Sequence, residues 1–150
     1  MPPPRAESPD GRWQAFTRDG NVYLRELDGG AELALSGEAG EEHFYQQRFF
    51  WSPDSSRLVA IRTTEGDVRR VFFVESSPRD QVQPRLQSYL YLKPGDRIPV
   101  DKPVLFDVER RKQIPIDEEL FSNPWSITRL AWDGDSSRFT FLYNERGHQA

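Results

Sequence analysis

One stretch of the sequence decides the fold: Trp51-Ser52-Pro53-Asp54-Ser55-Ser56-Arg57-Leu58-Val59-Ala60-Ile61. Proline presets φ for a turn, and Asp or Ser side chains bond backbone groups two residues further on. The apolar run that follows, residues 58–61, is typical of a strand. The stretch therefore predicts a tight polar turn that leads into a strand.

The same pattern occurs three times along the chain. The other two copies are Ser8-Pro9-Asp10-Gly11-Arg12-Trp13-Gln14-Ala15-Phe16 and Trp132-Asp133-Gly134-Asp135-Ser136-Ser137-Arg138-Phe139-Thr140-Phe141. Ser8, Ser52 and Asp133 take the same place in the three copies, at spacings of 44 and 81 residues. A propeller blade spans roughly 40–50 residues. The first spacing fits one blade, and the second fits either one blade with an insertion or two blades, one with a degenerate turn.

Further strands are expected between the turns, at residues 21–27, 32–36, 68–75 and 104–108, with a single helical turn at 117–121. We therefore predict an all-β fold, a partial β-propeller of about three blades of antiparallel strands. The blades are expected at residues 8–46, 47–121 with an insertion, and 122–150 as an incomplete blade. Trp51 and Trp132 should occupy equivalent positions in successive blades.

Residues 76–102 interrupt the pattern because they are rich in proline and charge. Their middle, residues 88–92, is apolar enough to form a strand, and the aromatic rings of Tyr89 and Tyr91 favour burial or a partner. We interpret the segment as an excursion from a blade, part strand and part ordered loop. A flexible surface loop is the alternative.

Composition excludes several classes of protein. The 150 residues carry 20 Lys and Arg against 24 Asp and Glu, for a net charge of -4, and contain no Cys. The acidic balance argues against a nucleic-acid partner, and the missing Cys excludes disulfides, thiolate metal sites and a cysteine nucleophile. Apolar runs are too short for a membrane segment, and no export signal is visible. The compartment therefore stays unknown.

No catalytic residue stands out. His43 and His148 are the histidines available as bases, neither matches a serine motif, and no Gly-x-Ser-x-Gly nucleophile elbow occurs. Asp10, Asp54, Asp133 and Asp135 are acidic turn residues that could either bind calcium or cap Asx turns. No Asp-x-Asp-x-Asp-Gly loop is present, so capping is favoured. No metal or cofactor is expected.

Three segments carry a resemblance to a known family. They are 51–62, with its Trp-Ser-Pro-Asp turn; Tyr89-Leu90-Tyr91-Leu92-Lys93-Pro94-Gly95-Asp96 with the strand 104–108; and the final segment 132–149. Together they resemble the propeller of the dipeptidyl peptidase IV group of the prolyl oligopeptidase family. The resemblance extends over nearly the whole chain, from about residue 8 to residue 149.

The resemblance implies a fragment. Members of that family have a seven- or eight-bladed propeller and a separate α/β-hydrolase domain with a Ser, Asp, His triad. They remove N-terminal dipeptides, and the propeller gates access and helps to anchor the peptide substrate. We therefore expect no activity from this chain alone, and expect the missing blades and the hydrolase domain as its partners. The parent is expected to be periplasmic or otherwise exported.

The resemblance also implies a role for Glu41 and Glu42. A Glu pair before a Trp-Ser-Pro turn binds the free amino terminus of the substrate in that family, and two carboxylates hold an ammonium by charge-assisted hydrogen bonds. The aromatic residues that lead into the family's pair are replaced here by the loop-like run 36–40. A plain acidic loop is the alternative.

Two other functions remain open from the sequence. The chain could be a stand-alone propeller module that binds other proteins and has no peptidase attached. Open blades also leave unpaired strand edges, which invite pairing between copies. A homo-oligomer is therefore a further expectation.

Overall fold

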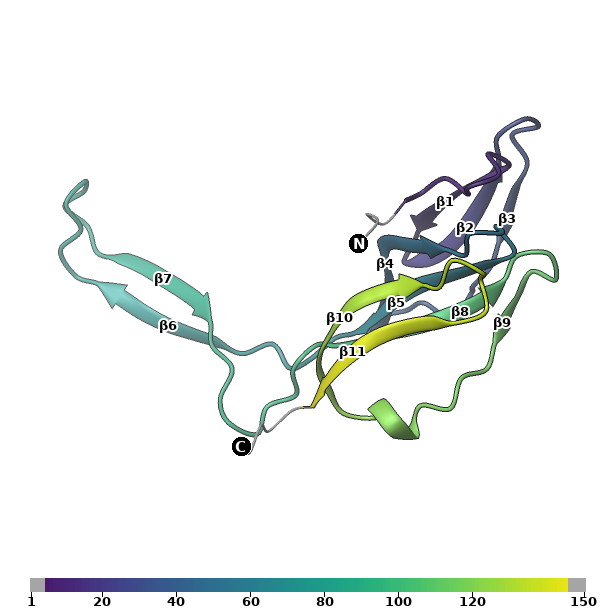
Figure 1. The fold of residues 1–150 in the computed structure, drawn as a ribbon. Coiled ribbons are helices and arrows are strands. Elements are labelled where there is room, and N and C mark those ends of the chain that lie inside the picture. The colour runs from purple at the N-terminus through teal and green to yellow at the C-terminus, as the bar shows by residue number, and fades with distance from the viewer. Residues whose placement is uncertain (1–4, 146–150) are drawn as a thin grey trace. The chain divides into compact units, whose positions relative to one another are not determined.

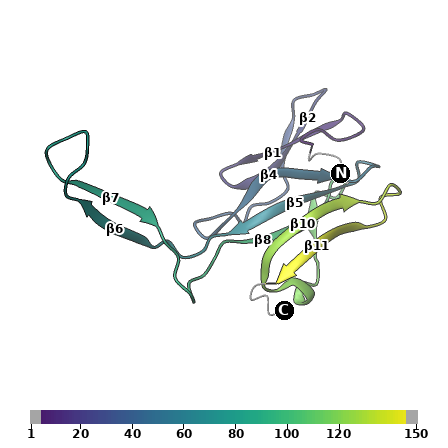
Figure 2. The ribbon, with the colours of Figure 1, turned by 60° about the vertical axis from the view of Figure 1, so that its left-hand side comes forward.

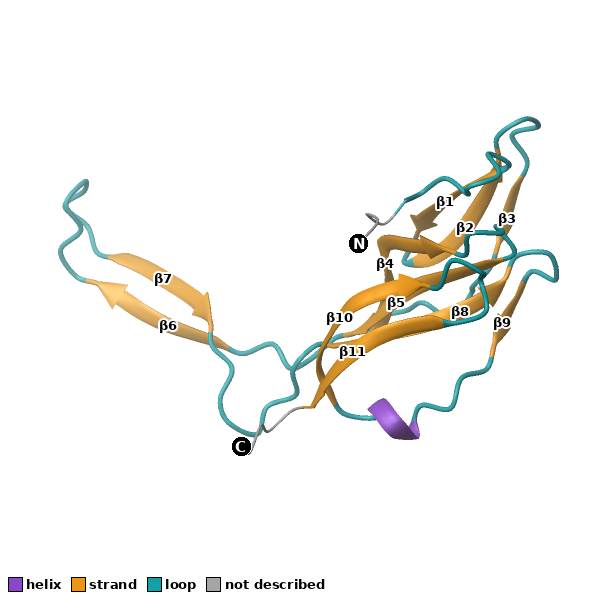
Figure 3. Cartoon of the chain, viewed as in Figure 1, coloured by secondary structure: helices purple, strands orange, loops and turns teal. Residues whose placement is uncertain are grey.

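The computed structural model describes residues 5–145. The chain divides into two compact units, one of residues 1–64 and 100–150 and the other of residues 65–99. Both are built from antiparallel strands, and the helical content of the described residues is the single 3-10 turn η1 (Glu119–Phe121) (Figures 1 and 3). No helix among the described residues is long and apolar enough to cross a membrane.

The first sheet of the larger unit has the order β1-β2-β3, with β1 (Trp13–Arg18), β2 (Asn21–Glu26) and β3 (Glu32–Ala34). Glu7 adds a bridge to Gln14 at the β1 edge. Apolar residues alternate along β2, where Val22 and Leu24 are fully buried. This period of two places one face of the sheet in the core.

The second sheet has the order β4-β5-β8-β9, and Figure 2 labels its first three strands. Its strands are β4 (His43–Trp51), β5 (Arg57–Thr64), β8 (Val100–Asp107) and β9 (Lys112–Ile114). The third sheet pairs β10 (Pro124–Trp132) with β11 (Phe139–Glu145). β4 and β10 each lead a turn motif and each carries an irregularity in register, between Tyr45 and Phe49 and between Thr128 and Ala131. The two strands therefore play the same part in successive repeats.

We call residues 5–34 the first repeat, residues 43–64 with 100–114 the second, and residues 124–145 the third. One core cluster joins the first two repeats and includes Ala15, Leu58 and Ala60. A second cluster joins the second and third repeats around Phe50, Val59 and Ile61. Strand β5 is buried on both faces because it alternates its side chains between these two cores.

The two tryptophans confirm the repeat. The Trp51 indole N–H donates to the Ala6 carbonyl at 3.2 Å, and the Trp132 indole N–H donates to the Phe50 carbonyl at 2.8 Å. Ala6 lies as far before the first turn as Phe50 lies before the second. The equivalence expected for Trp51 and Trp132 is therefore confirmed.

The smaller unit, residues 65–99, is built around a hairpin of β6 (Arg70–Glu75) and β7 (Arg85–Leu90). It contains a strand at residues 85–90, near the one expected at 88–92, and it begins before residue 76. The predicted all-β fold of antiparallel sheets is confirmed. The blade limits 8–46, 47–121 and 122–150 stay a prediction, while the three sheets of the larger unit lie at 13–34, at 43–64 with 100–114, and at 124–145.

Candidate functional site

The three turn motifs share one hydrogen-bonding pattern. In the second turn the Ser52 hydroxyl donates to Asp54 Oδ1 at 2.6 Å, and the backbone N–H of Ser56 donates to the same oxygen at 3.0 Å. Asp10 in the first turn accepts the equivalent bonds from the Ser8 hydroxyl and the Arg12 backbone N–H, and Asp135 in the third accepts from the backbone N–H and the hydroxyl of Ser137. These three carboxylates therefore cap turns, as predicted. Asp133 takes the place of Ser52 and joins its turn through its backbone N–H and C=O.

These bonds hold the turn carboxylates in their charged form. The Ser52 hydroxyl and the Ser56 backbone N–H lower the pKa of Asp54 to about 2, and the Ser137 hydroxyl lowers the pKa of Asp135. Among residues 5–145 no group of three or more His, Cys, Asp or Glu side chains could hold a metal ion.

Glu41 and Glu42 lie immediately before β4 and are exposed. The ion pairs among residues 5–145 involve neither of them. The strand begins with His43, which pairs with Thr64 at the end of β5. Both carboxylates are thus fixed to one end of the second sheet and free to meet solvent.

Other carboxylates at this end of the sheet are already engaged. Glu38 accepts a hydrogen bond from the buried Tyr45 hydroxyl. Glu118 accepts from Lys102 Nζ at 2.8 Å and lies 3.8 Å from Arg62 Nη2. Burial, reinforced by the Glu38 carboxylate, raises the pKa of Tyr45, so its hydroxyl stays a donor. Glu38 and Glu118 are therefore both satisfied by groups of the protein itself.

A second series of side-chain hydrogen bonds joins neighbouring strands of this sheet. Gln46 Nε2 donates to Thr63 Oγ1 at 2.7 Å, and the Thr63 hydroxyl donates to Asp101 Oδ1 at 2.7 Å. These bonds connect β4, β5 and β8. Sequence reasoning missed Glu38, Tyr45, Arg62 and Thr63, because the pairing of β5 with β8 across the 65–99 segment was not visible in the local pattern.

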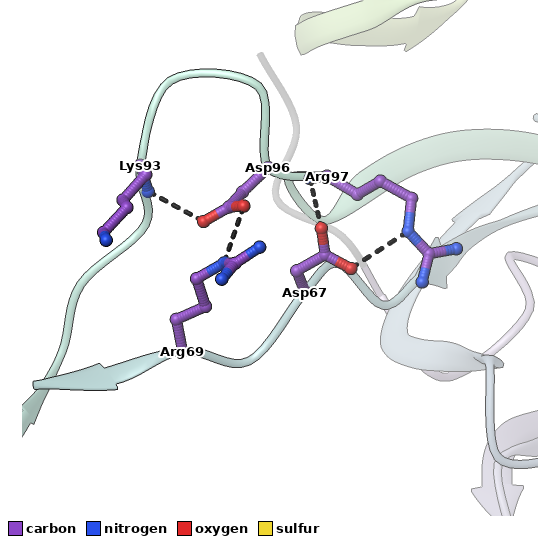
Figure 4. Close-up of polar contacts among 5 residues, drawn as sticks. All are labelled: Asp67, Arg69, Lys93, Asp96 and Arg97. Carbon is purple, nitrogen blue, oxygen red and sulfur yellow. Dashed lines mark hydrogen bonds and ion pairs between the residues drawn. The ribbon is translucent and has the colours of Figure 1, made fainter.

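The Lys93-Pro94-Gly95-Asp96 element lies in the smaller unit at the base of the hairpin (Figure 4). Asp96 accepts from Arg69 Nε at 2.7 Å and from the Lys93 backbone N–H at 2.8 Å. Alongside, Asp67 accepts from the backbone N–H of Arg97 at 2.8 Å and from its Nε at 3.1 Å. The two carboxylates therefore tie the outgoing and returning strands together.

Gly66 makes this tie possible. A Cβ at this position would collide with the carbonyl oxygen of Arg97. The backbone N–H of Asp67 also donates to that carbonyl at 2.8 Å. The close approach of the two chain segments thus requires glycine.

No catalytic constellation is formed by the described residues. His43 is half-buried at the start of β4, and residues 5–145 bring no serine into hydrogen-bond contact with it. His148 lies outside the described residues.

The comparison with known families decides the identity. The family model of the dipeptidyl peptidase IV N-terminal region matches residues 5–150. The chain belongs to this family. Probable dipeptidyl-aminopeptidase B of Pyrenophora teres f. teres is 26% identical over 156 residues, which cover 87% of this chain and 17% of that protein. The same-named protein of Colletotrichum graminicola is 29% identical over 166 residues, covering 86% of this chain and 18% of its own.

A solved structure shows the fold. The crystal structure of Porphyromonas gingivalis dipeptidyl peptidase 4 aligns with a TM-score of 0.58 and 21% sequence identity. The alignment covers 91% of this chain and 21% of that one. This dipeptidyl peptidase IV N-terminal region is therefore a partial β-propeller, as predicted. It spans about a fifth or less of the length of the relatives that it matches.

Proposed function

We propose that this chain is the non-catalytic propeller portion of a serine dipeptidyl peptidase, in which it gates access and helps to anchor the peptide substrate. The match to the dipeptidyl peptidase IV N-terminal region supports the proposal that the chain is part of such a peptidase. The remaining blades and an α/β-hydrolase domain are the partners that this role requires. Proteolysis belongs to the parent protein, because the described residues assemble no nucleophile with a base.

One observation carries the anchoring role. Glu41 and Glu42 are adjacent exposed carboxylates that immediately precede β4 and have no ion-pair partner among residues 5–145, whereas Glu38 and Glu118 are engaged. A peptide's amino terminus is an ammonium with three donors. Two adjacent carboxylates can accept from it by charge-assisted hydrogen bonds.

The test is a titration of the isotope-labelled chain with the dipeptide Ala-Pro, followed by NMR. We expect shifts of the backbone signals of residues 41–44. N-acetyl-Ala-Pro, which lacks the ammonium, should leave them in place. Substituting both residues, Glu41→Gln and Glu42→Gln, should weaken binding about tenfold or more. The matched control is Glu109→Gln, an exposed carboxylate elsewhere on the same unit.

Equal shifts with the free and the acetylated dipeptide would contradict the anchoring role. Unchanged binding in the double variant would do the same. In either case the plain acidic loop becomes the better description of residues 41–42.

Self-association is a second proposal, supported by the hairpin of the smaller unit. Four large apolar side chains share one face of β6 and β7: Phe72, Val74, Leu86 and Leu90, each between 62% and 68% exposed. A contiguous exposed apolar face of this kind is typical of a protein–protein contact. A homo-oligomer through this face is compatible with the anchoring role. The stand-alone interaction module is less favoured, because the relatives that the chain matches are much longer peptidases by name.

A further inference from the structure

Successive repeats of the larger unit are joined by two hydrogen bonds between their turns, and these bonds do not involve the residues proposed to bind peptide. Besides the tryptophan bond, the second and third turns each make a second bond to the turn before them. The Asp10 backbone N–H donates to Ser55 Oγ at 3.0 Å, and the Asp54 backbone N–H donates to Ser136 Oγ at 3.0 Å. Each later repeat thus supplies an indole donor and a hydroxyl acceptor, and each earlier repeat supplies a carbonyl and an amide.

The serine acceptor has a special backbone. Ser55 and Ser136 have φ of 62°, a left-handed conformation that serine adopts at a cost, and Gly11 holds the same place in the first turn with φ of 72°. Both serines are buried. A glycine would fit this conformation more easily. Serine stands at the two positions where its hydroxyl accepts from an amide of the preceding turn.

The third repeat also contains the carbonyl and the amide that an earlier repeat offers to the next one. Ala131 takes the place of Ala6 and Phe50, and Asp135 takes the place of Asp10 and Asp54. Among residues 5–145 the Asp135 amide bonds its own carboxylate and no other residue, and the Ala131 carbonyl receives the Thr140 hydroxyl at a long 3.4 Å. Leu142, which corresponds to the fully buried Ile61, is 53% exposed.

The first repeat lacks the indole donor and the hydroxyl acceptor that the later repeats supply. Glu7 stands where Trp51 and Trp132 stand, and Gly11 stands where the serines stand. The side chain of Phe16, in the place of Ala60 and Phe141, stacks on Tyr23 with centroids 5.7 Å apart. The guanidiniums of Arg18 and Arg25 lie over Phe16 at 5.2 and 4.9 Å, and both pair with Glu32. A charged layer therefore covers the face that the later repeats use for packing.

We propose that the face of the third repeat with Ala131, Asp135 and Leu142 is the docking surface for a further turn–strand repeat, one that presents a tryptophan indole and a left-handed serine hydroxyl at the same spacing. It continues the two interfaces already formed within the larger unit. A second copy of this chain is not the occupant, because its first repeat offers Glu7 and Gly11 instead of the two required groups.

The test extends the full chain with a second copy of residues 115–145 after Ala150, which supplies Trp132 and Ser136 in the appended repeat. Hydrogen exchange is followed at the original Asp135 amide. We expect exchange to slow at least tenfold and the melting temperature to rise. The matched control carries Trp132→Phe and Ser136→Ala in the appended copy only, and it should leave Asp135 unprotected.

Equal exchange at Asp135 in the extended chain and its control would overturn the proposal. So would protection of Asp135 in the unextended chain at rising concentration, since a second copy would then be the occupant. If the extended chain does not fold, Ser136→Ala in the unextended chain decides. The Asp54 amide should exchange at least tenfold faster while Asp10 stays unchanged, and an unchanged Asp54 rate would refute the recognition pattern.

Discussion

At the scale of single residues, the turn carboxylates cap the turns, as the polar sequence of each turn suggests. Asp54 accepts bonds from Ser52 and from both the amide and the hydroxyl of Ser56. The buried Ser52 in turn accepts from the Arg57 amide at 2.9 Å, which starts strand β5. A single carboxylate therefore fixes the geometry in which the strand leaves the turn.

This arrangement predicts a loss of stability in acid. The pKa of Asp54 is about 2 in the folded chain against a model-peptide value of 3.8. A carboxyl with a depressed folded pKa stabilises the fold above its unfolded pKa, and this contribution is lost as pH falls from about 4 to about 2. Asp54→Asn should therefore lower the free energy of unfolding at pH 6 and flatten its fall between pH 4 and pH 2. Urea unfolding across this pH range measures both effects.

Asp28→Asn is the control, since Asp28 is exposed in a loop of the same unit. It should leave the pH profile unchanged. An Asp54→Asn profile as steep as that of the unsubstituted chain would contradict the capping role.

At the scale of elements, the base of the hairpin is held by side chains rather than by a core. Asp96 is buried and binds Arg69 and the Lys93 amide, which lowers its pKa chiefly through the Lys93 bond. Most apolar residues of β6 and β7 are exposed. The order of this unit therefore depends on a few polar contacts at its base.

Asp96→Asn should loosen this base. An amide side chain keeps the shape but loses the charge that strengthens both bonds. We expect the Lys93 amide to exchange about tenfold faster, while amides of β5 and β8 keep their rates. Asp80→Asn near the hairpin tip, where Asp80 pairs with Arg85, is the control. Unchanged exchange at Lys93 would show that the carboxylate does not hold the element.

The exposed face of the hairpin gives a second prediction at this scale. Placing charges on that face, with Phe72→Asp and Leu86→Asp together, should abolish self-association of the chain in sedimentation velocity. Val82→Asp, at a residue that is 98% exposed outside the strands, should not. A double variant that associates as strongly as the unsubstituted chain would place the contact elsewhere.

The same scale shows what the sequence could and could not predict. Turn chemistry is local, so the three turns and most strands were predictable from Ser52, Asp54 and the apolar runs beside them. The pairing of Thr63 with Asp101 spans the inserted 65–99 segment, and no local pattern reports it. In the sequence, Ser55 and Ser136 look like ordinary turn residues. Their hydroxyls bond amides of the preceding turn, which the local sequence does not indicate. The place of Glu41 and Glu42 was predictable, but their lack of ion pairs required the structure.

At the scale of the whole chain, two cores and two bonds per interface hold three repeats in series, and β5 belongs to both cores. Each repeat contacts its neighbours, so stability should accumulate repeat by repeat. The described residues supply carboxylates, turns and strands, and the match covers only the N-terminal region of longer peptidases. Anchoring and gating are roles that such a part can perform without a nucleophile.

The most direct measurement is the rate at which the purified chain hydrolyses a Gly-Pro arylamide. The account predicts no release of the arylamine above that in buffer alone, with or without a serine-directed inhibitor. Turnover that the inhibitor removes would contradict it, because it would place a nucleophile and its base within this chain.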